Sequence, residues 1–106
     1  MKIAVCMKEV PDTMEVKIDR DKGTLIRSGI PSILNPFDVC ALECALQIKD
    51  NNDDVRVIVI SMGPPDAERN LREPLAMGAD EIYLITDEAF SGADTYATSY
   101  TISAAI

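Results

Sequence analysis

The sequence has no histidine and few cysteines: Cys6, Cys40 and Cys44 are all that it contains. Without histidine the chain lacks the commonest general base, the Ser/His and Cys/His nucleophile pairs and the commonest metal ligand, which excludes most hydrolase mechanisms. An odd number of cysteines without paired spacing argues against a disulfide framework and for a reducing compartment, so we expect a cytoplasmic protein. Cys40 and Cys44 have no further Cys or His with which to complete a tetrahedral metal site, and are interpreted as core residues.

Long apolar runs, positive charge and glycine-rich motifs are also scarce. Only five apolar residues, 3–7, precede Lys8, too few for a signal peptide or a membrane span, so no membrane insertion is expected. Lys and Arg number 10 against 18 Asp and Glu, which argues against nucleic acid as a partner. Neither the G-x-G-x-x-G dinucleotide fingerprint nor a P-loop motif occurs. The remaining composition, 47% hydrophobic and 26% charged over 106 residues, is that of one ordinary globular domain.

Apolar runs predict three parallel strands, at residues 3–7, 55–60 and 82–85. The first run is continuously apolar, which predicts a central strand buried on both faces, with Cys6 inside it. Residues 16–30 predict a hairpin that turns near Gly23 and leaves the sheet. Strand and helix alternate after residue 34, so we expect an α/β fold: an open, mostly parallel, Rossmann-like sheet with flanking helices.

Helices are predicted over 35–50, 66–77 and 94–106. Pro74 lies inside the second, where a proline removes a backbone hydrogen bond, and predicts a kink or an early stop. Two of the helices have apolar residues at helical spacing, which predict the faces that pack on the sheet. These faces are Phe37, Cys40, Ala41, Cys44, Ala45 and Ile48 on the first helix, and Ala97, Tyr100, Thr101, Ala104 and Ala105 on the third.

Ligands of open α/β sheets bind beyond the carboxyl ends of the strands, near helix N-termini whose free N–H groups attract phosphate. Thr95 and Thr98 stand on the first turn of the third helix, where both hydroxyls can face one phosphate, although ordinary capping is the favoured interpretation from spacing alone. Gly63 suits either close approach of a ligand or a turn, and Lys8 alone is best interpreted as a surface lysine. Glu68, Arg69, Arg72 and Glu73 are interpreted as a solvated face.

Four blocks of sequence, in order, resemble the beta subunit of electron transfer flavoprotein. They are residues 2–13, the Asn-Pro-Phe-Asp start of the first helix at 35–38 followed by Ala-Leu-Glu, Ser-Met-Gly-Pro-Pro at 61–65, and 71–80, which ends in Ala-Met-Gly-Ala-Asp. The resemblance covers nearly the whole chain. Pro74 departs from the alanine that the family usually has at its position.

The resemblance implies an adenine-nucleotide-binding α/β domain of the adenine-nucleotide alpha hydrolase-like type, an electron-carrier subunit rather than a stand-alone enzyme, paired with an alpha subunit. It implies that the Cys6 backbone, residues 35–38 and Met62 surround the adenine and ribose of AMP or FAD. Residues 92–98 resemble the electron-bifurcating pattern, in which threonines meet the phosphates of an FAD that accepts hydride from NADH. The predicted cofactor-binding residues are Cys6, Met7, Lys8, Asn35, Pro36, Phe37, Asp38, Met62, Gly63, Asp94, Thr95 and Thr98.

Two other hypotheses remain beside the FAD-binding, bifurcating one. The first is a non-bifurcating beta subunit that holds a structural AMP, and the second is a stand-alone nucleotide-binding module of the universal-stress type. The partners implied by the resemblance are the alpha subunit, an acyl-CoA-type dehydrogenase, and ferredoxin or flavodoxin. Residues 1–106 are expected to be the N-terminal part of one domain, without the family's glycine-rich phosphate loop and C-terminal arm, and so to bind nucleotide weakly or not at all by themselves.

Overall fold

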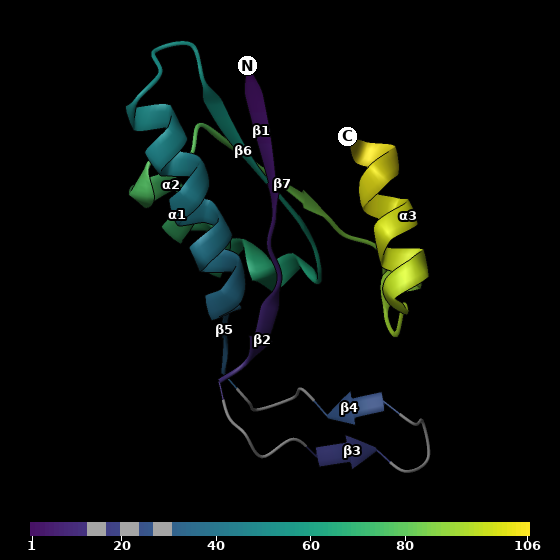
Figure 1. Cartoon of the computed structure of the whole chain (residues 1–106). Coiled ribbons are helices and arrows are strands. Elements are labelled where there is room, and N and C mark those ends of the chain that lie inside the picture. Colours follow the sequence, from purple (N-terminus) through teal and green to yellow (C-terminus); the bar gives the residue numbers. More distant parts are fainter. Residues whose placement is uncertain (13–16, 20–23, 27–30) are drawn as a thin grey trace.

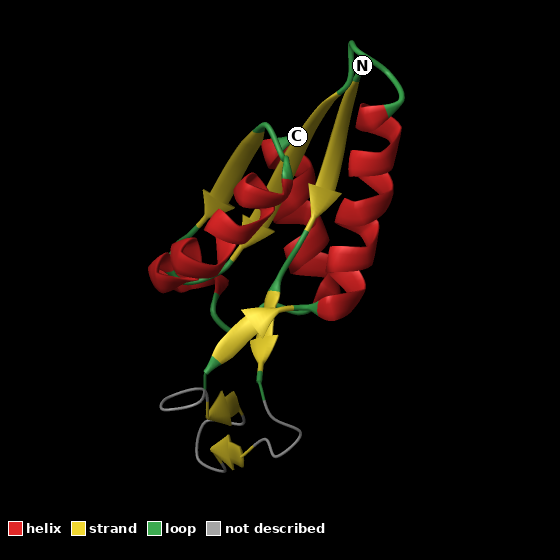
Figure 2. Cartoon of the chain, turned by 90° about the vertical axis from the view of Figure 1, so that its left-hand side faces the viewer, coloured by secondary structure: helices red, strands yellow, loops and turns green. Residues whose placement is uncertain are grey.

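The α/β class is confirmed by the computed structural model, which describes residues 1–12, 17–19, 24–26 and 31–106. Strands β1 (Lys2–Cys6), β6 (Arg56–Met62) and β7 (Glu81–Ile85) form a parallel sheet in the order β1-β6-β7. In Figure 2 the three arrows of this sheet point toward the same end of the molecule. Helices α1 (Pro36–Asp50) and α2 (Glu68–Met77) cover one face, and α3 (Thr95–Ala105) lies on the other (Figure 1).

Strand β1 lies at the edge of this sheet, so the prediction of a central position is wrong for the part of the chain that the structure describes. The central strand is β6, where Val57 and Val59 are fully buried. In β1 only Val5 is buried, and Cys6 is exposed, contrary to expectation. The physical reason is that an apolar run shows only that the side chains of a strand are suited to burial. The position of the strand in the sheet depends on its pairing with distant residues.

Two antiparallel ribbons leave the sheet at the carboxyl end of β1. The outer ribbon, β3 (Lys17–Asp19) with β4 (Thr24–Ile26), confirms the predicted hairpin in its described strands, while Val16 and the predicted turn lie outside the described residues. The inner ribbon, β2 (Glu9–Pro11) with β5 (Ser32–Leu34), was not predicted and joins the hairpin to α1. The excursion is therefore longer than expected, and it projects away from the sheet (Figures 1 and 2).

Helix α1 packs on the sheet through a different face from the predicted one. Leu42, Ala45 and Leu46 are buried, whereas Phe37 is 84% exposed and Ile48 is 43% exposed. Both stripes have helical spacing and overlap at Ala45, but the stripe with two leucines removes more apolar area from water. The predicted stripe is exposed apart from Ala45, and the prediction that Cys40 and Cys44 are core residues is wrong, because both are exposed.

Helix α2 follows a short 3-10 helix, η1 (Pro65–Ala67), and runs to Met77, so Pro74 does not stop it early. The Pro74 ring is almost completely buried, and this packing offsets the backbone hydrogen bond that the proline cannot donate. Gly78 ends the helix with a φ of 127°. The predicted second helix is thus confirmed, with a 3-10 start in place of its first α-helical turn.

Helix α3 starts where it was predicted to start, with Asp94 as its N-cap. It follows a second 3-10 helix, η2 (Glu88–Phe90). Of the predicted face only Thr101 is partly covered, and Tyr100 is 69% exposed. The half-buried residues of α3 are Thr98, Thr101 and Ile102. The face of α3 that is partly covered therefore lies about one residue further round the helix than the predicted face, which is wrong.

Asp80 joins three elements at the amino end of the sheet. Lys49 Nζ, near the end of α1, donates to Asp80 Oδ1 and to the Gly78 carbonyl, both at 2.9 Å. Asp80 Oδ2 accepts the Val57 N–H of β6 at 2.8 Å. The Ala-Met-Gly-Ala-Asp sequence is therefore a structural connector, at the opposite end of the sheet from the carboxyl ends of the strands.

The stability contributed by Asp80 should depend on pH. The hydrogen bond from Lys49, and then that from the Val57 N–H, hold the pKa of Asp80 below its ordinary value of 3.8. Because the pKa is lowered in the folded state, this contribution is complete above pH 3.8 and is lost as the pH falls through the folded-state pKa. We expect Asp80→Asn to lower the melting temperature at neutral pH, by a margin that narrows below pH 3.8. Thermal melts at a series of pH values test this, with exposed Asp53→Asn as a control that leaves the melting temperature unchanged; a margin independent of pH would contradict it.

Candidate functional site

The predicted residues after β1 and at the start of α1 are brought together. The N–H of Lys8 donates to Asp38 Oδ2 at 2.9 Å, and the N–H of Asn35 donates to the Lys8 carbonyl at 2.9 Å. Met7 is buried, and its N–H donates to the Ile60 carbonyl at 3.0 Å. Two chain segments that are distant in sequence therefore form one fixed corner at the carboxyl end of the sheet.

The first turn of α1 has no free backbone N–H for a phosphate among the described residues. Pro36 has no N–H, and the Phe37 N–H donates to Asn35 Oδ1 at 3.0 Å. The N–H groups of Asp38 and Val39 donate to the Asn35 carbonyl at 3.0 and 3.1 Å. Among the described residues, Asp38 Oδ1 and Asn35 Nδ2 have no partner, which leaves one acceptor and one donor for a ligand. This corner suits the hydroxyls and ring nitrogens of a nucleoside better than it suits a phosphate.

The carboxyl end of β6 carries Met62 and Gly63, which are both half-buried. The Gly63 N–H donates to the Ile85 carbonyl of β7 at 3.1 Å. A Cβ added at Gly63 would lie 3.6 Å from the Ala67 Cβ, an ordinary van der Waals contact. The fold itself therefore does not require glycine here, and close approach of a ligand remains a prediction.

The start of α3 differs from that of α1 because it keeps free donors. Asp94 Oδ1 accepts the Ala97 N–H at 2.8 Å, and the Asp94 carbonyl accepts the Thr98 N–H at 3.0 Å. Within the described part of the chain, the N–H groups of Thr95 and Tyr96 have no acceptor. Two donors at the positive end of the helix dipole are the arrangement that binds a phosphate oxygen.

Hydroxyl groups on α3 separate into two sets. Those of Ser99, Thr101 and Ser103 donate to carbonyls of the helix itself, at 2.8 to 2.9 Å. Those of Thr95 and Thr98 make no hydrogen bond with any residue that the structure describes. Asp94 rather than either threonine caps the helix, so the capping interpretation of the threonines is not supported.

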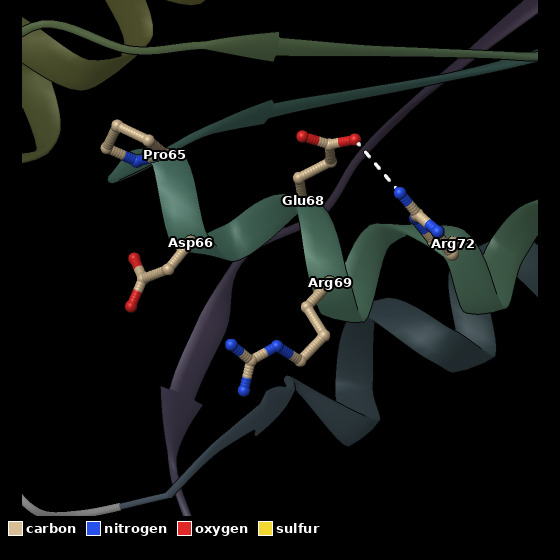
Figure 3. Close-up of a pocket in the computed structure, with 5 residues that line it drawn as sticks. All are labelled: Pro65, Asp66, Glu68, Arg69 and Arg72. Carbon is tan, nitrogen blue, oxygen red and sulfur yellow. Dashed lines mark hydrogen bonds and ion pairs between the residues drawn. The ribbon is translucent and has the colours of Figure 1, made fainter.

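Charged residues line two open hollows that the sequence analysis did not predict. The first has a volume of about 370 Å³ and is lined by Pro65, Asp66, Glu68, Arg69 and Arg72. Figure 3 shows Glu68 and Arg72 reaching toward one another, with Asp66 and Arg69 both below the ribbon. Arg72 donates to Glu68 Oε1 at 3.4 Å. The second, of about 290 Å³, is lined by Glu9, Pro31, Ser32, Asp66, Arg69 and Asn70. Neither hollow includes a predicted cofactor-binding residue, and no sequence signal distinguished these side chains from a solvated face.

Comparison with a known family agrees with the resemblance. Residues 22–106 match the family model of the electron transfer flavoprotein domain. The chain belongs to the electron transfer flavoprotein family. Its relatives place it on the beta-subunit side of that family, among proteins of electron transfer.

All 106 residues of this electron transfer flavoprotein chain align with curated relatives. Identity is 64% to the caffeyl-CoA reductase-Etf complex subunit CarD of Acetobacterium woodii and 64% to the electron transfer flavoprotein subunit beta of Clostridium acetobutylicum. It is 47% to the protein FixA of Sinorhizobium fredii. The chain spans 40%, 40% and 37% of the lengths of these relatives.

Neither a membrane-spanning helix nor a cluster of metal ligands occurs among the residues of this electron transfer flavoprotein chain that the structure describes. None of its described helices has both the length and the apolar character that a membrane span needs. Its described Cys, Asp and Glu residues form no group of three or more that could hold a metal ion. The candidate site is therefore built from backbone donors, amide and carboxylate groups and hydroxyls.

Proposed function

We propose that this chain is part of a beta subunit that binds FAD and works in the cytoplasm with an alpha subunit in electron bifurcation. When bound, the FAD supplies the redox chemistry by accepting hydride from NADH. This chain's own residues hold the nucleotide in place, and none of them acts as a general acid or base. The observation that carries the proposal is at the start of α3, where the hydroxyls of Thr95 and Thr98 and two N–H groups have no partner among the residues that the structure describes.

The corner at the start of α1 supports binding of the adenosine part. Cys6, Met7 and Lys8 line it with backbone, Phe37 adds an exposed aromatic ring, and Asn35 and Asp38 offer one donor and one acceptor. The start of α3 supports binding of the phosphates. Both helices begin at the same end of the sheet (Figure 1), so a single extended nucleotide can use both.

The topology also favours this end of β1 as a ligand site. Helices α1 and α2 on one face carry the chain from β1 to β6 to β7, and α3 returns on the other face. A right-handed crossover through α3 would place a following parallel strand beside β1. The strand order would then reverse at β1, and open α/β sheets bind their ligands at such a switch point.

The proposed electron partners follow from the relatives. One relative is named as a subunit of a caffeyl-CoA reductase-Etf complex, so we propose a dehydrogenase that acts on acyl-CoA-type thioesters as partner. Ferredoxin or flavodoxin is proposed as the other acceptor. Membership of the flavoprotein family sets aside the stand-alone universal-stress-type alternative.

The second candidate is a beta subunit that holds AMP as a structural nucleotide. It is favoured by the corner at α1, which suits an adenosine without any contribution from α3. Native mass spectrometry of the full-length protein with its alpha partner separates the two. We expect two FAD and no AMP per heterodimer. One FAD with one AMP would contradict the proposal that the beta subunit binds FAD.

The threonines can be tested in the same heterodimer. We expect the double substitution Thr95→Val and Thr98→Val to weaken retention of the beta-subunit FAD by at least about tenfold, because each hydrogen bond to a charged group contributes about 1.5 kcal/mol or more. The alpha-subunit flavin should be unaffected. Thr101→Val is the matched control, since its hydroxyl already bonds to the Ala97 carbonyl. Equal FAD retention by the double variant and the control, on dilution, would remove the threonines from the phosphate site.

A further inference from the structure

We infer that Asp38 makes the adenosine site selective for nucleotides with an unmodified ribose, and that it rejects adenosines phosphorylated at the ribose 2′ or 3′ position. The inference rests on the proposed function, because it assumes that an adenine nucleotide occupies this corner. It concerns the class of nucleotide that is accepted, which the family assignment leaves open.

The carboxylate of Asp38 is fixed in position. Its Oδ2 accepts the Lys8 N–H at 2.9 Å, and the residue is half-buried. The other oxygen, Oδ1, has no partner among the described residues. An ionised carboxylate can only accept hydrogen bonds, so it binds a ribose hydroxyl and repels a phosphate at the same place.

The surrounding groups do not offset that repulsion. Every backbone N–H on the first turn of α1 already has an acceptor or, at Pro36, does not exist, so the uncharged Asn35 amide is the one donor left there among the described residues. The whole chain also carries a net charge of -8. Lys8 is the one nearby cation on the segments that form the corner, and its exposed side chain is hydrated and carries a single charge.

Such selectivity has a use in the proposed setting. Coenzyme A carries a phosphate on the 3′ position of its adenosine, and a partner that acts on acyl-CoA thioesters works among high concentrations of it. An adenosine site without discrimination would be open to coenzyme A as a competitor. A fixed carboxylate against the ribose excludes this competitor and keeps the site for FAD or AMP.

The test compares AMP with adenosine 3′,5′-bisphosphate and adenosine 2′,5′-bisphosphate, which each differ from AMP by one phosphate. Their dissociation constants are measured by calorimetry on the full-length protein with its alpha partner, after removal of the beta-subunit nucleotide. We expect both bisphosphates to bind at least about a hundredfold more weakly than AMP, since placing like charges together costs several kcal/mol. In Asp38→Asn this gap should shrink to less than about tenfold, because the negative charge that repels the second phosphate is removed.

Glu43→Gln is the matched control, because it removes one negative charge from an exposed position on the same helix. The Glu43 side chain forms no hydrogen bond with any residue that the structure describes. The difference in affinity between AMP and the two bisphosphates should be the same in Glu43→Gln as in the wild type. If the wild-type protein binds AMP and both bisphosphates equally, the inference is overturned and the proposed function stands. If the gap persists in Asp38→Asn, Asp38 is not the selective residue. If neither AMP nor FAD binds the wild-type protein, the proposed function itself fails.

Discussion

Replacing Leu42 with alanine is expected to lower the free energy of unfolding by about 3 kcal/mol, whereas Cys44→Ala is expected to change it by less than about 0.5 kcal/mol. Leu42 is fully buried between α1 and the sheet, so its truncation leaves a cavity in addition to the lost transfer free energy. Cys44 is exposed on the other stripe of the same helix, where truncation creates no cavity. The two residues lie only two positions apart on one helix, so their local backbone is closely matched.

Urea denaturation of the intact protein, followed by circular dichroism, measures both variants. Ile48→Ala adds a second position on the exposed stripe and should also be nearly neutral, at less than about 1 kcal/mol. A large loss in Cys44→Ala together with a small loss in Leu42→Ala would show that α1 packs through the stripe predicted from the sequence. A large loss in both would show that the second stripe is covered in the intact protein.

These two stripes illustrate where sequence patterns lose their power. The start of α1 is determined by local chemistry, since Asn35 caps it and Pro36 fits its first position. The buried face is determined by the sheet, which covers whichever stripe removes more apolar area from water. Two stripes at the same spacing cannot be ranked by periodicity alone.

The strand order has a similar limit. The runs at β1, β6 and β7 identify parallel strands because they are rich in apolar and β-branched residues. The neighbour of each strand, however, depends on crossovers that span dozens of residues. The inner ribbon, β2 with β5, escaped prediction because three-residue strands contain too few positions for alternation to be recognised.

The candidate site was predicted only in part, and the reason differs from the one that limits prediction of the fold. The topology rule and the family resemblance together identified Met7, Lys8, Asn35 and Asp38. The structure joins Lys8 to Asn35 and Asp38 by hydrogen bonds, while the Met7 N–H donates to Ile60 of the neighbouring strand. The rule also treats every helix N-terminus as a potential phosphate site. Only the hydrogen bonds show that α1 has used all of its first-turn backbone donors, while α3 keeps two that have no acceptor in the described part of the chain. The sequence spacing of Thr95 and Thr98 contains no information about which hydroxyls bond back to the helix.

Gly78→Ala is expected to lower the free energy of unfolding by about 2 kcal/mol, because residues with a side chain rarely adopt its backbone conformation. Gly78 has a φ of 127°, and its N–H and that of Ala79 close the end of α2 by donating to the Leu75 and Pro74 carbonyls. An added Cβ would also lie 3.4 Å from Leu46 Cδ2, at the edge of ordinary contact. The strain would act on the connector that delivers Asp80 to Lys49 and Val57, so α1, β6 and β7 would be affected together.

Two other glycines separate the causes of this loss. Gly92 has a φ of 77° with open space around it, so Gly92→Ala should cost about 1 kcal/mol from backbone strain alone. Gly63 does not have a positive φ, and its added Cβ would make only an ordinary contact, so Gly63→Ala should be neutral or slightly stabilising. If denaturation of the intact protein gave the same small change for all three variants, the left-handed turn at Gly78 would not be what fixes the α2 to β7 connection. The expected order of losses, Gly78 above Gly92 above Gly63, ties the Ala-Met-Gly-Ala-Asp sequence at the end of α2 to the geometry of one turn.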